Sequence, residues 1–361
     1  MRLVSTASIQ SGATLGQTIY RDNGTVLLQR GMKLTDRLVK RLENQGITYV
    51  YIEDELTKDI VVQPAISERL RQDATTSMKK LFTDVQKSNL LSNSFILDKE
   101  EKSLMDIIQR IMDEINNHQE SITLLGDIYL TDDYIFQHSL NVTIYALAIG
   151  TELKLNAKEL SELGKGAILH DIGKIFISQD ILQKPDRLLD DEYETMKTHT
   201  TLGYELLRKN HSYSSVVAHC AYQHHERLNG TGYPRGLVGE SIHLFAQIIG
   251  VADVFDAVTS NRVYRKAMLP HEGLELLYSA AVDQFDSRII NAFKNSVAVY
   301  PNGMTVELND NRYGVVLKQN KHLCDRPIVR IIQDEYGIDV TPYTIDLSKE
   351  LNITITKCNL S

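Results

Sequence analysis

Cysteine is scarce in this sequence and tryptophan is absent. The three cysteines, Cys220, Cys324 and Cys358, lie far apart and form no Cys-x-x-Cys spacing. Structural zinc sites built from paired thiolates are therefore excluded. Isolated cysteines at this frequency are typical of reduced thiols in a cytoplasmic protein, and we expect them to be buried packing residues.

Long apolar runs and an excess of positive charge are also missing. Nowhere do eighteen apolar residues follow one another, and residues 1–10 have no sustained apolar stretch, so we predict neither a membrane span nor a signal peptide. The formal net charge of −8 argues against a protein that binds nucleic-acid polymers through a broad basic face. We expect a cytoplasmic protein in which local cations meet any anionic ligand.

The chain does have the length and composition of a multidomain globular protein. Its 361 residues are 42% apolar and 24% charged, which suggests two or three domains. The apolar patterning predicts a small α/β module over 1–60, a helical connector over 61–120, a helical bundle over 121–297 and a small β appendage over 298–361. The expected fold class is mainly α.

The first module shows strand and turn signals. Asp22-Asn23-Gly24 predicts a hairpin turn between strands at Thr18–Tyr20 and Val26–Leu28. A short helix follows and ends near Gly46, and Ile47–Ile52 predicts another strand. Because no residue here points to catalysis, we interpret the module as a regulatory or interaction domain, with a purely structural cap as the alternative.

The connector carries two apolar stripes at helical spacing. One runs from Ile66 to Val85 and the other from Leu104 to Ile115, with a mostly polar break at Ser92–Phe95. The stripes fit either pairing with a second copy of the chain, as a homodimer, or packing on the next domain.

The remaining patterns are helical and then strand-like. Helices are expected at Tyr134–Leu153, Lys158–Leu169, Glu192–Asn210, Ser215–His225, Phe245–Ser260 and His271–Ser296, with a loop at Asn229–Gly239. Strands are expected at Met304–Leu308, Gly314–Leu317, Ile328–Ile332 and Ile353–Ile355, forming an appendage packed on the helical core.

The stretch Ile168–Lys174 holds the first candidate site. His170 and Asp171 end an apolar helical run and offer a metal an imidazole nitrogen beside a carboxylate that can bridge two ions. Such a pair is common by chance. Its weight comes from four more histidines in helical contexts of the same segment, and from an aspartate among apolar neighbours that needs a cation or several donors: His138, His199, His224, His225 and Asp253.

These five imidazoles and two carboxylates exceed the needs of one four-coordinate ion. Two divalent ions that share one carboxylate would use the whole set and leave open positions for water or substrate. Nitrogen and oxygen ligands without thiolate fit iron or manganese best, with zinc, nickel or cobalt as alternatives. A structural metal site is the competing interpretation, but such sites are usually closed and need fewer ligands.

Several ordered motifs resemble the HD-GYP family, a branch of the HD phosphohydrolases that linearises cyclic di-GMP. The similarity covers roughly residues 121–296 and implies an HD-type catalytic domain. It rests on His170-Asp171-Ile172-Gly173-Lys174, His199, His224-His225-Glu226-Arg227, Gly232-Tyr233-Pro234 and the segment around Asp253.

The resemblance also implies a ligand set and a partner. One metal would be held by His138, His170, Asp171 and Asp253, and the second by His199, His224 and His225, with Asp171 shared. Some members bind a third metal through a glutamate one helical turn before the first histidine, where this chain has Tyr134. Two ions are therefore expected. Ser178 and Asn229 also depart from the family pattern, which implies tuning rather than loss of activity. The Gly-Tyr-Pro motif implies contact with diguanylate cyclase (GGDEF) domains.

The expected activity is hydrolysis of cyclic di-GMP to pGpG by a metal-bridging hydroxide, with further hydrolysis to GMP left open. Two metals lower the pKa of a shared water and neutralise charge on the phosphate. Lys174 is expected to bind a non-bridging phosphate oxygen. Asp256 lies three residues beyond Asp253, so it would orient the water, handle the leaving-group proton or hydrogen-bond a ligand histidine.

Other substrate contacts remain open. Arg262 and Arg265 fit phosphate or guanine binding, or a solvated charged face. Tyr233 fits stacking on a guanine, or shaping of its loop. Lys184 and Arg235 are weaker candidates. Two functions compete with the leading one: a catalytically silent cyclic-dinucleotide sensor that signals through the N-terminal module, and an HD phosphohydrolase that acts on another nucleotide or a mixed cyclic dinucleotide.

Overall fold

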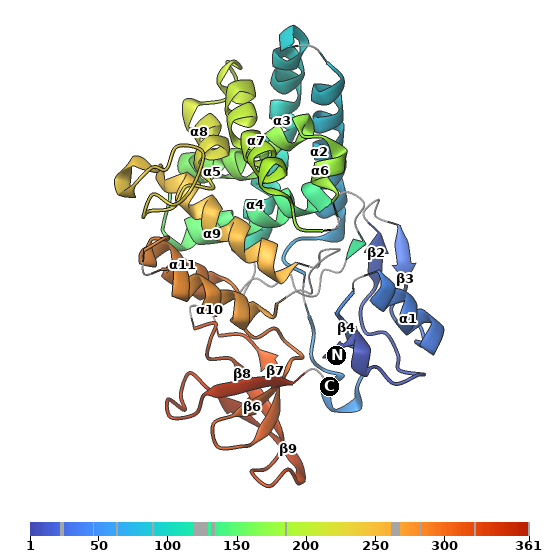
Figure 1. Ribbon diagram of the computed structural model, residues 1–361. Coiled ribbons are helices and arrows are strands. Elements are labelled where there is room, and N and C mark those ends of the chain that lie inside the picture. Colours follow the sequence, from blue (N-terminus) through green and yellow to red (C-terminus); the bar gives the residue numbers. More distant parts are fainter. Residues whose placement is uncertain are drawn as a thin grey trace.

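The computed structural model describes residues 1–21, 25–45, 47–62, 64–88, 90–117, 129–130, 134–184, 186–260, 268–281, 283–320 and 323–359. Helices dominate, and a helical body carries an N-terminal module on one side and a C-terminal sheet below it in the view of Figure 1. The predicted fold class, mainly α with a β appendage, is confirmed.

The helical body contains ten of the eleven α-helices in the described part of the chain. Their bounds are α2 Glu68–Lys87, α3 Leu90–Asn117, α4 Tyr134–Glu152, α5 Ala157–Leu169, α6 Gln179–Leu182, α7 Asp190–Arg208, α8 Ser215–Gln223, α9 Leu244–Thr259, α10 Pro270–Ala280 and α11 Ser287–Ser296.

One continuous core lies inside this body. Apolar side chains of α2 and α3, among them Leu81 and Ile108, are buried in the same cluster as those of α4, α5, α8 and α9. The two connector stripes therefore pack on the helical bundle, which was one of the two alternatives. Burial of so much apolar surface is the main force that holds the helices together.

Two helix boundaries differ from expectation. The break expected at Ser92–Phe95 is wrong, because α3 runs through it; the chain breaks instead at Ser88, which ends α2 in an extended conformation. The single helix expected over His271–Ser296 is also wrong. Asp286 caps a new helix by accepting a hydrogen bond from the backbone N–H of Arg288, so α10 and α11 are separate.

The N-terminal module combines short strands with one helix. Strands β2 (Ile19–Arg21) and β3 (Val26–Leu28) pair antiparallel as expected, although the turn residues 22–24 lie outside the described part. The expected helix is α1 (Asp36–Asn44). Strand β4 (Tyr49–Ile52) pairs antiparallel with β1 (Arg2–Ser5), a strand that the sequence did not predict. A short β5 (Tyr129–Leu130) pairs parallel with β2.

The C-terminal segment forms a five-stranded antiparallel sheet in the order β10-β6-β7-β8-β9. Its strands are β6 Thr305–Leu308, β7 Tyr313–Lys318, β8 Ile328–Gln333, β9 Asp339–Asp346 and β10 Ile355–Asn359. Three lie close to the predicted positions. Strand β9 was missed, and the last strand lies later than Ile353–Ile355.

We expected the sheet to pack on the helical core. Instead, it shares a separate apolar core with the N-terminal module. Leu3 of β1 and Tyr51 of β4 are buried among apolar residues of β6, β7 and β8. The Tyr51 hydroxyl donates to the carbonyl of Asn302 (3.1 Å). Arg330 of β8 makes two hydrogen bonds to the carboxylate of Asp59 (2.7 and 2.6 Å). The two ends of the chain are thus joined in one unit.

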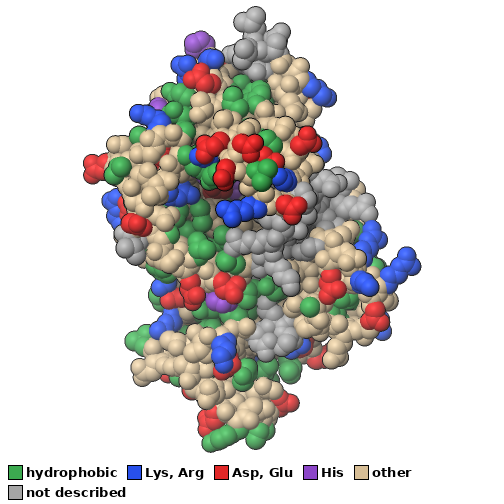
Figure 2. Space-filling view, in the orientation of Figure 1, with side chains coloured by type: hydrophobic (Ala, Val, Ile, Leu, Met, Phe, Trp, Pro, Cys, Tyr) green, Lys and Arg blue, Asp and Glu red, His purple; other side chains and the backbone are tan. Residues whose placement is uncertain are grey.

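Charge is mixed on the face that Figure 2 draws, where acidic and basic side chains of the described residues are interspersed over the helices. Among those same residues, none of the helices combines the length and apolar character needed to span a bilayer.

Candidate metal centre

Five helices converge on one buried cluster of imidazoles and carboxylates. Helix α4 supplies one histidine, the end of α5 a His-Asp pair, α7 another histidine, the end of α8 two histidines and α9 an aspartate. All seven residues named from the sequence lie there: His138, His170, Asp171, His199, His224, His225 and Asp253. The structure brings these side chains together; their role as ligands stays a prediction.

Local sequence explains how α5 presents its pair. Asn156 accepts hydrogen bonds at the start of the helix and Glu159 bonds back to it, which fixes where α5 begins. Its C-terminal half is completely buried and ends at His170. A short 3-10 helix, Ile172–Phe176, follows at once and packs against α7, so Asp171 is held between α5 and α7.

The carboxylate of Asp171 faces two groups of histidines. Its Oδ2 lies 3.3 Å from Nε2 of His170 and 3.6 Å from Nε2 of His138. Its Oδ1 lies 3.3 Å from Nε2 of His199 and 3.8 Å from Nε2 of His224. Within each group, the candidate ligand atoms lie no more than 4.8 Å apart, and His225 belongs to the second group. Asp171 is the one residue common to both.

Asp253 lies across the cluster from the α5 end. Its Oδ1 is 3.0 Å from Nε2 of His138, and its Oδ2 is 3.7 Å from Nδ1 of His225. The aspartate expected to need a cation is therefore buried among imidazoles. It contacts one member of each histidine group.

Hydrogen bonds on the outer side of the cluster select the histidine tautomers. The Nδ1 atoms of His170, His199 and His224 donate to the backbone carbonyls of Ala167 (2.6 Å), Met196 (2.7 Å) and Cys220 (3.1 Å). Because a carbonyl only accepts, each Nδ1 carries the proton and each Nε2 presents a lone pair to the centre. This tautomer is the one that binds a metal through Nε2.

Burial and charge set the protonation of these groups. Burial lowers the pKa of His199 to about 4 and holds the pKa of His224 and His225 well below the usual range. Burial alone would raise the pKa of the Asp171 carboxyl, yet the neighbouring Lys174 ammonium holds it well below its usual range. The neutral imidazoles of His199, His224 and His225 beside a charged carboxylate are in the protonation state that metal binding requires. Burial opposes protonation of His138, but the Asp253 and Asp256 carboxylates raise its pKa to about 9, so this imidazole must lose a proton to bind a metal.

The unpaired atoms of the cluster fit a cation. Among the described residues, Nε2 of His170 and Oδ1 of Asp171 are buried with no hydrogen-bond partner. Nε2 of His199 and Nε2 of His224 lie 3.4 Å apart although both Nδ1 atoms already donate elsewhere, so two lone pairs face each other. Buried unsatisfied polar atoms are costly. Divalent cations bound in the two groups would accept these lone pairs.

Comparison with protein families decides what this centre belongs to. A family model described as "HD domain" matches residues 102–289, just over half of the chain. The chain belongs to the HD domain family. Its resemblance to the HD-GYP branch is confirmed, because relatives of the chain are named cyclic di-GMP phosphodiesterases. A second model, a KOW domain associated with HD domain, matches residues 305–359, which form the C-terminal sheet of this HD protein.

Three curated relatives illustrate the similarity. A cyclic di-GMP phosphodiesterase of Pseudomonas aeruginosa is 34% identical over 63% of this chain and 54% of its own length. The cyclic di-GMP phosphodiesterase response regulator RpfG of Xanthomonas campestris is 43% identical over 40% of this chain and 38% of its own. The 3'3'-cGAMP-specific phosphodiesterase 3 of Vibrio cholerae is 34% identical over 51% and 40%. The chain thus spans about half, or less, of the length of these relatives.

The residues predicted to contact the substrate differ in their placement. Lys174 is partly buried and its ammonium contacts Oδ2 of Asp171. The ring of Tyr233 stacks on His225, with centroids 4.6 Å apart. Lys184 pairs with Glu192, and Arg235 is exposed. Arg262, Arg265 and the side chain of Tyr134 lie outside the described residues.

Asp256 lies behind the cluster. Its Oδ2 accepts from Nδ1 of His138 (2.7 Å), and its Oδ1 accepts from the amide of Asn141 (2.9 Å) and the hydroxyl of Ser260 (3.0 Å). Both oxygens are thus engaged with protein donors. Among the three roles considered for Asp256, this geometry favours orientation of a histidine ligand.

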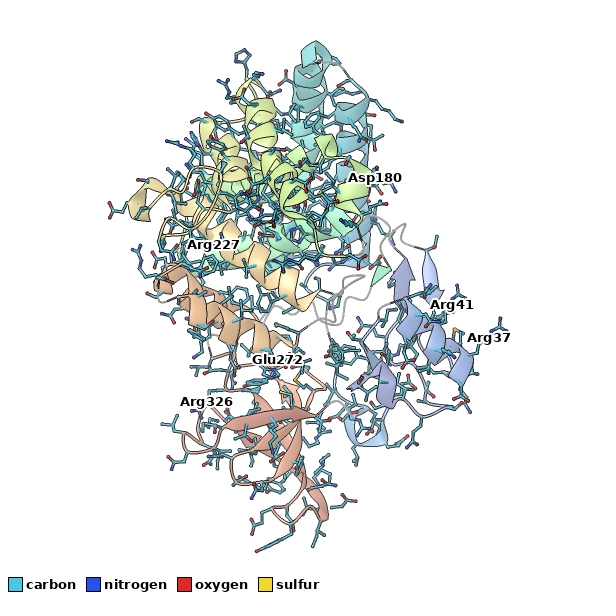
Figure 3. The ribbon with its side chains drawn as sticks, in the orientation of Figure 1. Arg37, Arg41, Asp180, Arg227, Glu272 and Arg326 are labelled. Carbon is cyan, nitrogen blue, oxygen red and sulfur yellow. The ribbon has the colours of Figure 1, made fainter. Side chains whose placement is uncertain are left out.

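Two residues of the His-His-Glu-Arg motif have roles that sequence reasoning missed. Both carboxylate oxygens of Glu226 accept backbone N–H groups of the following loop, from Arg235 and Leu237 (2.8 Å each). Arg227, labelled in Figure 3, donates to the carbonyls of His224 (3.2 Å) and Glu226 (2.9 Å). The available signal was a carboxylate directly before a Gly-rich loop, since such a loop needs acceptors for its free N–H groups.

Proposed function

We propose that this protein is a metal-dependent phosphodiesterase that hydrolyses cyclic di-GMP to pGpG, and onward to GMP. The observation that carries the proposal is the position of Asp171, whose two carboxylate oxygens face two separate groups of imidazoles. The names of the relatives supply the substrate class. A carboxylate shared in this way is typical of two-metal hydrolases.

We propose two divalent ions, iron or manganese, with zinc, nickel or cobalt as alternatives. Residues His138, His170, Asp171 and Asp253 would hold one ion, and His199, His224 and His225 would hold the other together with Asp171. When bound, such ions activate a water and offset the negative charge of the phosphate. The absence of thiolate ligands in the described cluster favours metals that prefer nitrogen and oxygen.

The surrounding residues would bind and orient the dinucleotide. The Lys174 ammonium, beside Asp171, would bind a non-bridging phosphate oxygen. Tyr233, already stacked on His225, would shape the Gly-Tyr-Pro loop and offer its remaining surface to a guanine. Arg262 and Arg265 are proposed as phosphate or guanine contacts. Asp256 would hold His138 in the tautomer that presents Nε2.

Hydrolysis of cyclic di-GMP by the full chain tests the proposal. Metal-free protein, prepared anaerobically, is loaded with Mn²⁺ or Fe²⁺ and the products are separated by chromatography. Appearance of pGpG is expected in the wild type and loss of turnover in Asp171→Asn. Asp180→Asn, a change at an exposed aspartate of α6, is the matched control and should retain activity. Turnover that survives in Asp171→Asn would refute the mechanism.

The same experiment separates the competing functions. A silent cyclic-dinucleotide sensor would bind the ligand without hydrolysis in any divalent metal. A preference for a mixed cyclic dinucleotide is favoured by the name of the Vibrio cholerae relative. Competition of labelled cyclic di-GMP by 3'3'-cGAMP and by mononucleotides would distinguish the substrates.

Partners and regulation are further parts of the proposal. The Gly-Tyr-Pro loop would contact GGDEF-type proteins, and the N-terminal module would act as a regulatory or interaction domain. A homodimer remains a proposal, and because the connector stripes are buried in the helical core, it would need another surface. Sedimentation of the full chain at several concentrations would test it.

A further inference from the structure

A chain of hydrogen bonds leads from the connector helix α2 to the metal centre. The guanidinium of Arg71 donates through Nη1 to Oδ1 of Asn141 on α4 (3.3 Å). The amide of Asn141 donates to Oδ1 of Asp256 on α9 (2.9 Å). Asp256 in turn accepts from Nδ1 of His138 (2.7 Å). Three helices are linked in this way behind one candidate ligand.

Burial makes Arg71 unusual among the cations of the chain. Its side chain is 2% exposed and belongs to the largest fully buried side chains of the described residues. Removing a guanidinium from water is costly unless polar groups satisfy it. A residue with apolar atoms only would fill the same space without this cost, so the charge and the donors of Arg71 point to a specific polar function.

At its far end, the chain of hydrogen bonds fixes the orientation of the His138 ring. With Nδ1 engaged by Asp256, the ring turns Nε2 toward Asp253 (3.0 Å) and Asp171 (3.6 Å). Outer hydrogen bonds of this kind fix both the tautomer and the ring angle of a ligand histidine. Displacement of Asn141 would loosen Asp256 and, through it, His138.

The near end lies where the connector leaves the N-terminal module. Arg71 is the fourth residue of α2, one turn after Ser67, which caps the helix. The Ser67 hydroxyl donates to Glu114 of α3 (2.7 Å). A few residues earlier, Asp59 is bound to Arg330 of the C-terminal sheet. A shift of the unit formed by the N-terminal module and the C-terminal sheet would therefore reach the helical body at the start of α2.

We propose that Arg71 is a positioning residue that couples the start of the connector helix to the metal centre through Asn141, Asp256 and His138. This inference rests on the proposed metal-dependent function. Coupling is reciprocal, so metal binding should also stabilise the start of α2.

The test compares Arg71→Met with Arg110→Met in the full chain. Arg110 pairs with Asp73 of α2 (2.8 Å) from the neighbouring helix α3, so its loss also removes a cation contact to α2 but leaves the hydrogen-bond chain intact. Mn²⁺ affinity is measured by competition with a chelator. The Nδ1–H resonance of His138 is followed by NMR in metal-free protein and in protein loaded with diamagnetic Zn²⁺, and is assigned by its loss in His138→Ala.

Arg71→Met should weaken Mn²⁺ binding about 10-fold and shift the His138 resonance, whereas Arg110→Met should change neither. Asn141→Ala, which breaks the chain without removing a buried charge, should have the same effect, and the double variant should be no worse than either single one. If Arg71→Met matches Arg110→Met, or if its effect adds fully to that of Asn141→Ala, the proposal is overturned.

This test does not measure hydrolysis, so failure of the proposed phosphodiesterase function can be distinguished from failure of the proposed role of Arg71. A wild-type protein that binds no metal refutes the proposed function. In that protein, the His138 resonance of the metal-free chain still decides whether Arg71 acts on the histidine.

Discussion

The backbone of Gly173 lies directly against the backbone of His199. A Cβ added at Gly173 would stand 1.9 Å from the carbonyl oxygen of His199 and 2.6 Å from the backbone nitrogen of Gly203. Only glycine permits this approach, because real Cβ atoms do not come so near to backbone atoms. The contact holds the Asp171 segment against α7, so the two groups of the metal centre depend on it.

Gly173→Ala should therefore destabilise the protein and separate Asp171 from His199. A clash with backbone atoms cannot be relieved by a rotamer change, so we expect a loss of about 3 kcal/mol in unfolding free energy and reduced metal content. Urea unfolding and elemental analysis measure both. Gly203→Ala is the graded control, since its Cβ would meet the nearest atom, the Gly173 nitrogen, at 3.3 Å. Equal losses in the two variants would contradict the prediction.

Lys174 should affect turnover more than metal binding. Its ammonium adjoins Asp171 but lies at the partly exposed edge of the cluster, where it can reach a phosphate. Lys174→Met should lower kcat about 100-fold, the usual effect of removing one donor to a developing charge, while metal content stays near that of the wild type. Lys174→Arg should recover part of the rate. Loss of metal in Lys174→Met, with kcat per bound metal unchanged, would show a purely structural role.

Glu226 should control the order of the Gly-Tyr-Pro loop. In Glu226→Gln an NH₂ group takes the place of one carboxylate oxygen. One of the two loop N–H groups then has no acceptor, at a cost of about 1–3 kcal/mol. Amide hydrogen exchange of residues 229–239 should accelerate while exchange in α4 and α5 is unchanged. Glu240→Gln, at an exposed position of the same loop region, should not alter exchange. A loop as protected as in the wild type would exclude this role for Glu226.

Apolar spacing predicted most helices because the helical body buries nearly continuous stripes. The grouping of the seven candidate residues was also predictable, because several histidines and an aspartate among apolar neighbours need a shared explanation; their role as ligands stays a prediction. Strand β9 was missed because it is an edge strand whose exposed Thr341 and Tyr343 show no apolar alternation. Strand β1 is stabilised mainly by pairing with β4, a contact that short-range patterns do not encode. The role of Asp256 depended on the direction of its two oxygens, which spacing along a helix leaves open.

The ion pair of Asp59 and Arg330 should make the docking of the N-terminal module pH-dependent. The Arg330 guanidinium lowers the pKa of Asp59 to about 2 from an ordinary value of 3.8. Because the folded pKa is the lower one, the pair stabilises the fold above about pH 4, and this contribution is lost as the pH falls from 4 toward 2. The Asp59 side chain is 56% exposed, so the contribution should stay below about 1 kcal/mol.

Urea unfolding of Asp59→Asn should show this deficit at pH 7 and a smaller one at pH 3. Glu335→Gln, the loss of one negative charge at an exposed turn of the sheet, should show no such pH-dependent difference. A deficit in Asp59→Asn that is the same at both pH values would mean that the ion pair does not contribute.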